Sequence, residues 1–314
     1  MDNGKTFIDK NVLVVMSTYN GAEFIEEQMN SILQQENIGN IHILIRDDGS
    51  TDQTVERIEK VQRDNPEKIT LVKGKNIGCN ASFFALLKMA KGYDYYSISD
   101  QDDVWLPDKI CVALQWLEKE TDRTKPLLYA STSYLAKGSN LKIYGQTRKQ
   151  CRPFSIYNTI IQNICPGHNQ VFNNALLALL KKPIDVSQIY VYDAWITNIA
   201  MLYGKILFNN ESFTLYRQHQ NNKLGYGAGF WGRLACSYRK MRCKDDWLYL
   251  RQTRYFLSEQ EDMLVKAGYE DTLRKAFLSE RIVDRLKSIW DGRLYRQSYA
   301  ETMAFYLLFL WDVV

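Results

Sequence analysis

The 314-residue sequence predicts an α/β fold, with a mixed sheet carrying helices on both faces and a helical region at the C-terminus. Short β-branched runs alternate with helix-like segments between Asn11 and Ser99, and these runs are apolar throughout, as strands buried on both faces require. Gly and Pro fill only 17 and 6 positions, and 46% of residues are hydrophobic and 24% charged. This balance excludes collagenous and wholly disordered proteins.

Four apolar runs are each followed by a helical pattern. The strands are expected at residues 12–16, 41–45, 69–72 and 93–99, and the helices at 22–34, 52–62, 81–90 and 107–118. A further strand is expected at 127–130, and helices dominate after Gly229, with breaks at Gly268 and Gly292. In doubly wound sheets the ligand lies beyond the carboxyl ends of the strands. The functional residues are therefore expected at those ends.

Three of the expected strands end in polar clusters. They are Ser17-Thr18-Tyr19-Asn20-Gly21, Arg46-Asp47-Asp48-Gly49-Ser50 and Ser99-Asp100-Gln101-Asp102-Asp103. Because these ends share one sheet edge, five carboxylates and an aromatic ring should meet in one crevice. A divalent cation such as Mg²⁺ or Mn²⁺ would relieve their repulsion and leave positions open for phosphate oxygens. Taken singly, each acidic cluster is equally typical of an Asx turn with a helix N-cap.

These clusters resemble the motifs of family 2 glycosyltransferases of the GT-A fold, a Rossmann-like class. The matching stretches are residues 17–21, 47–52, Asn76-Ile77-Gly78 and 100–109, in that order. Further on, Tyr192-Asp193-Ala194-Trp195-Ile196 and residues 215–222 resemble the bacterial rhamnosyltransferase-like branch. The resemblance covers about residues 10–225.

The resemblance implies a nucleotide-sugar donor lying across the strand ends. Tyr19 would lie near the base, and Asp47 or Asp48 would accept a hydrogen bond from the pyrimidine N3–H. We favour Asp48 because the chain bends sharply at Gly49. The other donor-binding residues that the family implies are Ser17, Thr18, Asn76, Gly78, Asp100 and Arg217.

The resemblance also implies a metal ion, Mn²⁺ or Mg²⁺. Asp102 would ligate it directly, Asp100 would lie near the ribose or a metal-bound water, and His219 would complete the ligands. Arg217 and His219 share a face of an extended segment, so Arg217 could hold the diphosphate. For His219, an ordinary surface histidine is the alternative interpretation.

Asp193 is the residue we expect to act as general base. An inverting transfer needs a carboxylate opposite the leaving group to deprotonate the acceptor hydroxyl. A helical pattern begins here, so Asp193 could instead be an N-cap. On the acceptor side we expect His168 and Trp195, with a turn-stabilising role as the alternative for His168.

The net charge of +4 lies in the C-terminal part of the chain. Residues 1–220 hold 24 bases and 24 acids, and the remainder holds 16 and 12. Between Gly229 and Phe256 the bases are interleaved with aromatic residues, a composition typical of segments that lie on anionic membranes. The alternative is a helix that packs its aromatic residues on the catalytic domain. We predict two domains, 1–225 and 226–314, the second a candidate for membrane association.

The sequence therefore predicts an inverting, metal-dependent glycosyltransferase that moves L-rhamnose from dTDP-L-rhamnose to a lipid-linked precursor of a cell-surface polysaccharide. A UDP-hexose or UDP-N-acetylhexosamine transferase is one alternative, and an inactive sugar-nucleotide or membrane-binding module is another. We expect no nucleic-acid partner, because no recognised binding motif occurs. The six cysteines lack disulfide or zinc spacing, so we expect a cytoplasmic protein held peripherally on the inner face of the bacterial membrane.

Overall fold

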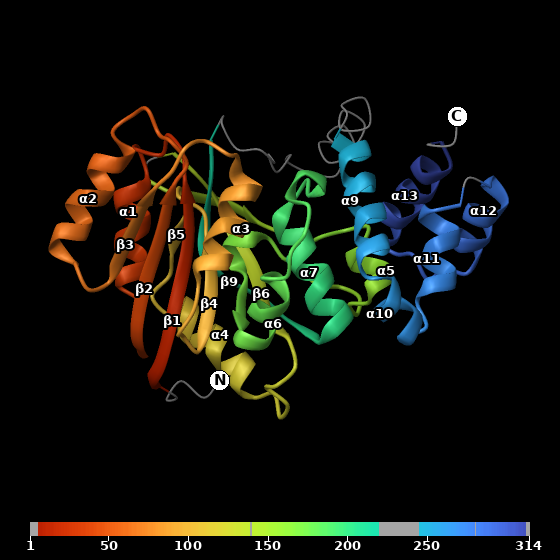
Figure 1. The fold of residues 1–314 in the computed structure, drawn as a ribbon, viewed down its shortest axis with the longest axis horizontal. Coiled ribbons are helices and arrows are strands. Elements are labelled where there is room, and N and C mark those ends of the chain that lie inside the picture. The colour runs from red at the N-terminus through yellow and green to blue at the C-terminus, as the bar shows by residue number, and fades with distance from the viewer. Residues whose placement is uncertain (1–5, 139, 220–244, 280, 312–314) are drawn as a thin grey trace.

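The computed structural model describes residues 6–138, 140–219, 245–279 and 281–311, which form a mixed sheet with helices around it (Figure 1). In sheet order, the described strands are β3 (Ile69–Lys73), β2 (Ile38–Asp47), β1 (Phe7–Thr18), β4 (Tyr95–Ser99), β8 (Val171–Asn173), β6 (Leu127–Lys137), β9 (Lys205–Gln218) and β5 (Val104–Trp105). The strand β7 (Lys142–Gln146) pairs with β6 off this path. Four of the five strands expected from the sequence lie within observed strands, and the fifth, expected at residues 93–99, begins two residues later as β4.

The sheet is parallel in its first half and mixed in its second. β1 pairs in parallel with β2 and β4, and β2 with β3. β8 runs antiparallel to both β4 and β6, whereas β9 runs parallel to β6 and antiparallel to β5. The parallel strands β1, β2 and β4 place residues 17–21, 47–52 and 99–103 at one edge. The predicted mixed α/β fold is confirmed.

Helices cover both faces of the sheet, and each face has its own hydrophobic core. One core packs α1 (Ile25–Leu33), α2 (Thr54–Asp64) and α4 (Lys109–Glu118) against β1 and β2, with Met29, Ile58 and Leu114 fully buried. The other core contains residues of α3 (Cys79–Met89), α6 (Asn174–Leu180) and α7 (Tyr192–Tyr203). Three short elements complete this part of the chain: α5 (Ile156–Thr159), η1 (Gly167–Asn169) and η2 (Val186–Gln188).

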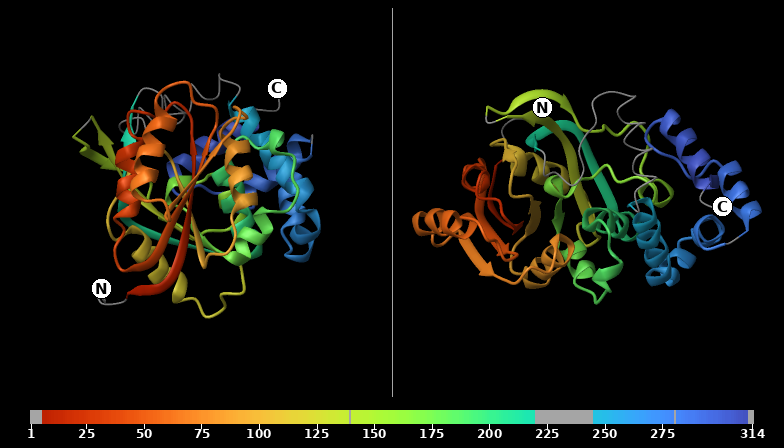
Figure 2. Two further views of the ribbon diagram at one scale, coloured as in Figure 1. Left: turned by 60° about the vertical axis from the view of Figure 1, so that its left-hand side comes forward. Right: turned by 90° about the horizontal axis from the view of Figure 1, so that it is seen from above.

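Five described C-terminal helices lie at one end of the long axis, opposite α2 (Figures 1 and 2). They are α9 (Asp245–Glu259), α10 (Glu261–Lys266), α11 (Glu270–Phe277), α12 (Ile282–Trp290) and α13 (Tyr299–Trp311). Phe256, Leu273 and Phe305 belong to the same hydrophobic cluster as the sheet residues. Gly268 and Gly292 follow α10 and α12 with positive φ, so both predicted breaks are confirmed.

Some predictions about the C-terminal region stay predictions. Residues 229–244 of the basic aromatic segment lie outside the described residues, as does the expected domain boundary near residue 225. The described end of that segment packs on the body of the protein, where Tyr255 stacks on Trp195 at 5.5 Å. In the described ranges, every helix is too short or too polar to cross a lipid bilayer.

Candidate active site

The turn after β2 is built around two buried carboxylates. Asp47 Oδ1 accepts hydrogen bonds from the hydroxyls of Thr18 and Ser50, and Oδ2 accepts the backbone N–H groups of Gly49 and Ser50 at 3.1 and 2.9 Å. Gly49 has φ +80°, which a residue with a Cβ rarely adopts. A carboxylate offers about four acceptor positions, and Asp47 has filled them all. The Asx-turn interpretation therefore holds for Asp47.

Asp48 makes a different set of hydrogen bonds and keeps more acceptor capacity than Asp47. Its Oδ1 accepts the Ile77 N–H at 2.9 Å and a guanidinium N–H of Arg46, and its Oδ2 accepts the Gly78 N–H at 2.9 Å. One acceptor position of about four remains for a ligand. Asp48 also fixes the loop that carries Asn76, since it bonds the two residues that follow. Asp48, unlike Asp47, therefore keeps an unused acceptor position, although both carboxylates are buried.

Tyr19 is the exposed member of the cluster after β1. Its ring is 47% exposed, and its backbone N–H and C=O both bond the Gln101 side-chain amide, at 2.9 and 3.1 Å. Gly21 leaves the space that the Gln101 side chain occupies, since a Cβ there would overlap it. Ser17 bonds Ser82 at 2.6 Å and lies beneath the surface. The clusters after β1 and β4 are thus joined through Gln101.

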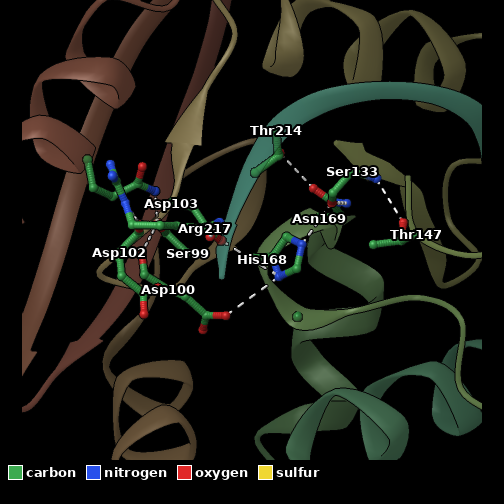
Figure 3. Close-up of polar contacts among 12 residues, drawn as sticks. Ser99, Asp100, Asp102, Asp103, Ser133, Thr147, His168, Asn169, Thr214 and Arg217 are labelled. Carbon is green, nitrogen blue, oxygen red and sulfur yellow. Dashed lines mark hydrogen bonds and ion pairs between the residues drawn. The ribbon is translucent and has the colours of Figure 1, made fainter. Parts of the chain in front are cut away.

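The carboxylates after β4 form two groups. In the first, Asp100 and Asp103 flank His168, whose Nδ1 lies 3.6 and 3.8 Å from one oxygen of each (Figure 3). The other ring nitrogen, Nε2, lies 2.9 Å from the Ser133 hydroxyl, and the ring stacks on Tyr216. Asp103 and His168 are buried, whereas the Asp100 side chain is 35% exposed.

Asp103 carries an incompletely satisfied buried charge. Its Oδ1 accepts the Arg217 backbone N–H at 3.1 Å, but Oδ2 makes no hydrogen bond with any described residue. Burial, with the nearby charges of Asp102 and Asp100, raises the pKa of Asp103 well above its ordinary value. A cation near Asp103 would provide a partner for Oδ2 and would offset the burial and the repulsion that raise this pKa.

Lys109 brings its amino group into the protein interior beside the acidic cluster. Its buried ammonium group donates to the His168 carbonyl and lies 3.6 Å from the centre of the Trp105 ring. Burial lowers the pKa of Lys109 well below its ordinary value, while Asp103 and Asp100 oppose that shift. Lys109 therefore joins α4 to η1 beneath the acidic cluster.

The second group joins Asp102 to β9. His219 Nε2 lies 2.8 Å from Asp102 Oδ2, and the ring of His219 stacks on Phe24. The Arg217 guanidinium donates to the Asp102 carbonyl at 2.9 Å and to Glu27, and Arg217 is 3% exposed. Arg217 is thus engaged with its own chain, whereas Asp102 and His219 keep 18% and 24% of their side-chain surface exposed.

Asp193 lies in the first turn of α7 and faces the same site. Its Oδ2 accepts the Gly167 N–H at 3.0 Å, and its buried Oδ1 makes no hydrogen bond within the described part of the chain. The N-cap of α7 is Val191, so the capping alternative for Asp193 does not hold. Burial, followed by the charge of Asp100, raises the pKa of Asp193 to about 7. The neighbouring Tyr192 hydroxyl lies 3.5 Å from Asp100 Oδ1.

Two expectations for the acceptor side need correction. Trp195 is 2% exposed and packs between Tyr255 and Phe256 in the core, so its indole cannot contact an acceptor. It is two residues from Asp193 along α7, so the two side chains lie on nearly opposite sides of the helix. His168 is 3% exposed and lies beneath Asp100, without the exposed surface of an acceptor loop.

Sequence reasoning missed Asp103, Lys109, Gln101 and Ser133 as individual contributors. The first three stand in or beside the motif of residues 100–109, so the run of charged residues was a usable signal for them. Ser133 lies in the middle of β6 and carries no sequence signal that distinguishes it from an ordinary strand serine.

Comparison with known proteins decides the family. Residues 13–182 match the family model described as Glycosyl transferase family 2. The chain belongs to this family, and it is a glycosyltransferase. It is 32% identical over 228 residues to the dTDP-rhamnosyl transferase RfbG of Shigella flexneri, covering 68% of this chain and 75% of that one. An uncharacterized glycosyltransferase of Rickettsia prowazekii, RP339, is 25% identical over 272 residues, 82% of this chain and 81% of its own.

The fold of this glycosyltransferase also occurs in solved structures. TarS 1-349 of S. aureus in complex with UDP superposes with a TM-score of 0.57 at 16% identity, over 87% of this chain and 72% of TarS. The same protein with UDP-GlcNAc gives 0.54 at 16% identity, over 90% and 89%. These likenesses confirm the GT-A fold.

Proposed function

We propose that this glycosyltransferase inverts the anomeric carbon of its donor and moves L-rhamnose from dTDP-L-rhamnose to a saccharide acceptor. The similarity to RfbG, which spans two thirds of the chain, is the observation that carries the choice of donor. Transfer of a hexose or an N-acetylhexosamine from a UDP-sugar is the competing proposal, since the nucleotide contacts would be shared.

The acidic edge fits a divalent cation. Asp100, Asp103 and His168 bring potential ligand atoms within 4.8 Å of one another, and Asp103 Oδ2 is buried without a hydrogen bond among the described residues. We assign Asp100, Asp102 and His219 as the residues that would hold Mn²⁺ or Mg²⁺, because their side chains are the exposed members that a diphosphate can approach. An ion held there would neutralise the diphosphate and stabilise charge on the departing nucleotide. Asp103 and His168 support these residues from below.

The donor and base assignments rest on which groups can still take a partner. Tyr19 offers an exposed ring for the nucleobase, and Asp48 retains an acceptor position for an N–H of that nucleobase. Asn76 and Gly78 would bring backbone close to the donor, and Ser17 and Thr18 support that surface from behind. Asp193 would take the acceptor proton, since a pKa of about 7 is the value at which a base is both deprotonated and strong near neutral pH.

The acceptor that we propose is a lipid-linked glycan precursor, which would place the protein peripherally on the inner face of the bacterial membrane. The excess of bases beyond residue 220 supports an anionic surface as partner.

A donor panel tests this function. Purified protein with Mn²⁺ is given dTDP-L-rhamnose, UDP-glucose, UDP-galactose or UDP-GlcNAc together with a lipid-linked acceptor, and release of nucleotide is followed. Release from dTDP-L-rhamnose at the highest kcat/KM, with an α-rhamnoside identified by NMR, is expected. Preferential release from a UDP-sugar supports the competing proposal, and retention of the donor's anomeric configuration contradicts inversion. Asp102→Asn is the control for release that does not need the site.

A further inference from the structure

The last two helices of the chain expose a row of large apolar side chains each. On α12 the row is Ile282, Leu286 and Trp290, exposed by 47, 46 and 92%, and on α13 it is Tyr299, Met303 and Leu307, exposed by 77, 59 and 69%. Within each row the residues are four apart, which places them on one side of a helix. Singly exposed apolar residues need no explanation, but two such rows on neighbouring helices do.

The two rows lie on the same side of the helix pair. Arg285, in the first turn of α12, packs over the Phe309 ring and donates to its carbonyl at 3.4 Å, near the end of α13. This contact brings the start of α12 against the end of α13, as in an antiparallel pair of helices. On each helix, a turn of about 100° in the same direction around the helix axis leads from the residue that contacts the partner helix to the exposed row. In an antiparallel pair, this arrangement places both rows on the same side of the pair. We call the surface made by these six residues the α12–α13 face.

Charge borders this face without interrupting it. The exposed bases on and beside α12 are Arg281, Lys287 and Arg293, whereas Asp291 is the exposed acid there. Asp284 is partly buried and accepts a hydrogen bond from Ser279. On α13, Glu301 turns toward Arg148, with which it forms an ion pair at 2.7 Å. The exposed side of α13 from Tyr299 to Leu307 therefore carries no charge among its described side chains.

We propose that the α12–α13 face binds the headgroup layer of an anionic lipid bilayer. An apolar row with Trp and Tyr, bordered by Lys and Arg, is the composition that interfacial helices use. A second copy of the chain is the less suitable occupant, because a two-fold contact through this face would bring its surplus of bases together. This surface is distinct from the basic segment 229–256 and does not depend on the identity of the donor sugar.

Vesicle sedimentation tests the proposal on the full chain. Vesicles of phosphatidylcholine with one third phosphatidylglycerol should retain the protein, and Leu286→Glu with Leu307→Glu should lower the partition coefficient by at least about tenfold, because leucine side chains would no longer enter the lipid. Ile143→Glu, at a residue 49% exposed on β7, is the matched control and should bind like wild type. Equal sedimentation of all three proteins would overturn the proposal.

Two further measurements keep the result interpretable if the double variant folds poorly. Lipids with a fluorescence quencher at the headgroup–acyl boundary should quench tryptophan emission, and Trp290→Phe should remove part of that quenching. Light scattering during chromatography measures the mass of the protein without lipid. Unchanged quenching in Trp290→Phe would refute the lipid contact, and a dimer that Leu307→Glu dissociates would assign the face to a second copy instead.

Discussion

Replacement of Asp193 by Asn should lower activity and raise stability at the same time. Burial raises the pKa of this carboxyl from 3.8 to about 7, and Asp100 adds to the effect. Because Asn is nearly isosteric, its amide oxygen can keep the hydrogen bond from the Gly167 N–H. The substitution therefore removes the ionisable group while preserving the packing around it.

The sign of the stability effect follows from proton binding. Between pH 4 and 7 the folded protein holds a proton on Asp193 that the unfolded chain has released, so the stability from this group is present in acid and is lost as pH rises to 7. Above pH 7 the folded protein carries a buried carboxylate. A shift of about 3 pKa units corresponds to at most about 4 kcal/mol of unfolding free energy. Asp193→Asn should recover part of this at pH 8 and almost none at pH 4.

The activity of the same variant should change in the opposite direction. In wild type, kcat/KM should fall about tenfold per pH unit below the pKa of Asp193, where the base is protonated. Asp193→Asn should reduce kcat by roughly 10²- to 10⁴-fold and remove this acid limb, while donor affinity changes little.

Thermal unfolding with EDTA at pH 4 and pH 8, together with the pH profile of turnover, measures both effects. Asp185→Asn is the matched control. Hydrogen bonds from Ser187 lower the pKa of this exposed carboxyl, so replacing Asp185 should lower stability at pH 8 rather than raise it. A variant of Asp193 that is less stable than wild type at both pH values, or that keeps the acid limb, would refute the assignment of Asp193 as base.

Four other changes separate the roles of the site from those of the core and the tail. EDTA should abolish nucleotide release and Asp102→Asn should reduce it at least about 100-fold with an unchanged circular dichroism spectrum; full activity in excess EDTA would exclude the metal assignment. Arg217→Lys should raise the Mn²⁺ concentration for half-maximal activity about tenfold, since lysine lacks the Nε–H that donates to the Asp102 carbonyl. An unchanged titration would show that this contact does not order Asp102. Trp195→Ala should cost about 3 to 5 kcal/mol of stability in denaturant unfolding but leave the activity of the folded fraction near wild type, whereas a selective rise in acceptor KM would restore its acceptor role. Replacing four bases outside the described residues with Gln should weaken binding to anionic vesicles in sedimentation and make it insensitive to salt; these bases are Arg239, Lys240, Arg242 and Lys244. Unchanged salt dependence would argue against a membrane role for the basic segment.

Most of the sheet could be predicted because its signal is local. A short, largely apolar run such as residues 41–45 favours a strand buried on two faces, and the polar cluster that follows it is then expected at the sheet edge. The long strand β9 and the hairpin of β6 with β7 were not predicted, since residues 205–218 mix polar and apolar side chains without strict alternation. Their pairing partners decide their conformation, and those partners are distant in sequence.

The supporting residues of the site were beyond sequence reasoning for the same reason. Lys109 meets the carbonyl of His168 across 59 residues, and Arg217 meets Glu27 across 190. No spacing rule connects such pairs. Trp195 shows the opposite failure: its place in the motif beside Asp193 suggested a ligand contact, but successive residues of a helix point to different sides. The motif indicated the location of the site without separating its ligand-facing residues from its core.

Burial supplies that separation. Asp47, Asp103, Arg217, Lys109 and His168 are each less than 10% exposed and are held by other parts of the chain, so removing one would leave a buried partner unsatisfied. The members that stay open at the same edge are Tyr19, Asp100, Asp102 and His219. A ligand can be exchanged only at the open members, because the buried ones would lose a bond for each one gained. Substitutions in the buried set should therefore reduce stability and activity together, and substitutions in the open set should reduce donor or metal binding while the protein stays folded.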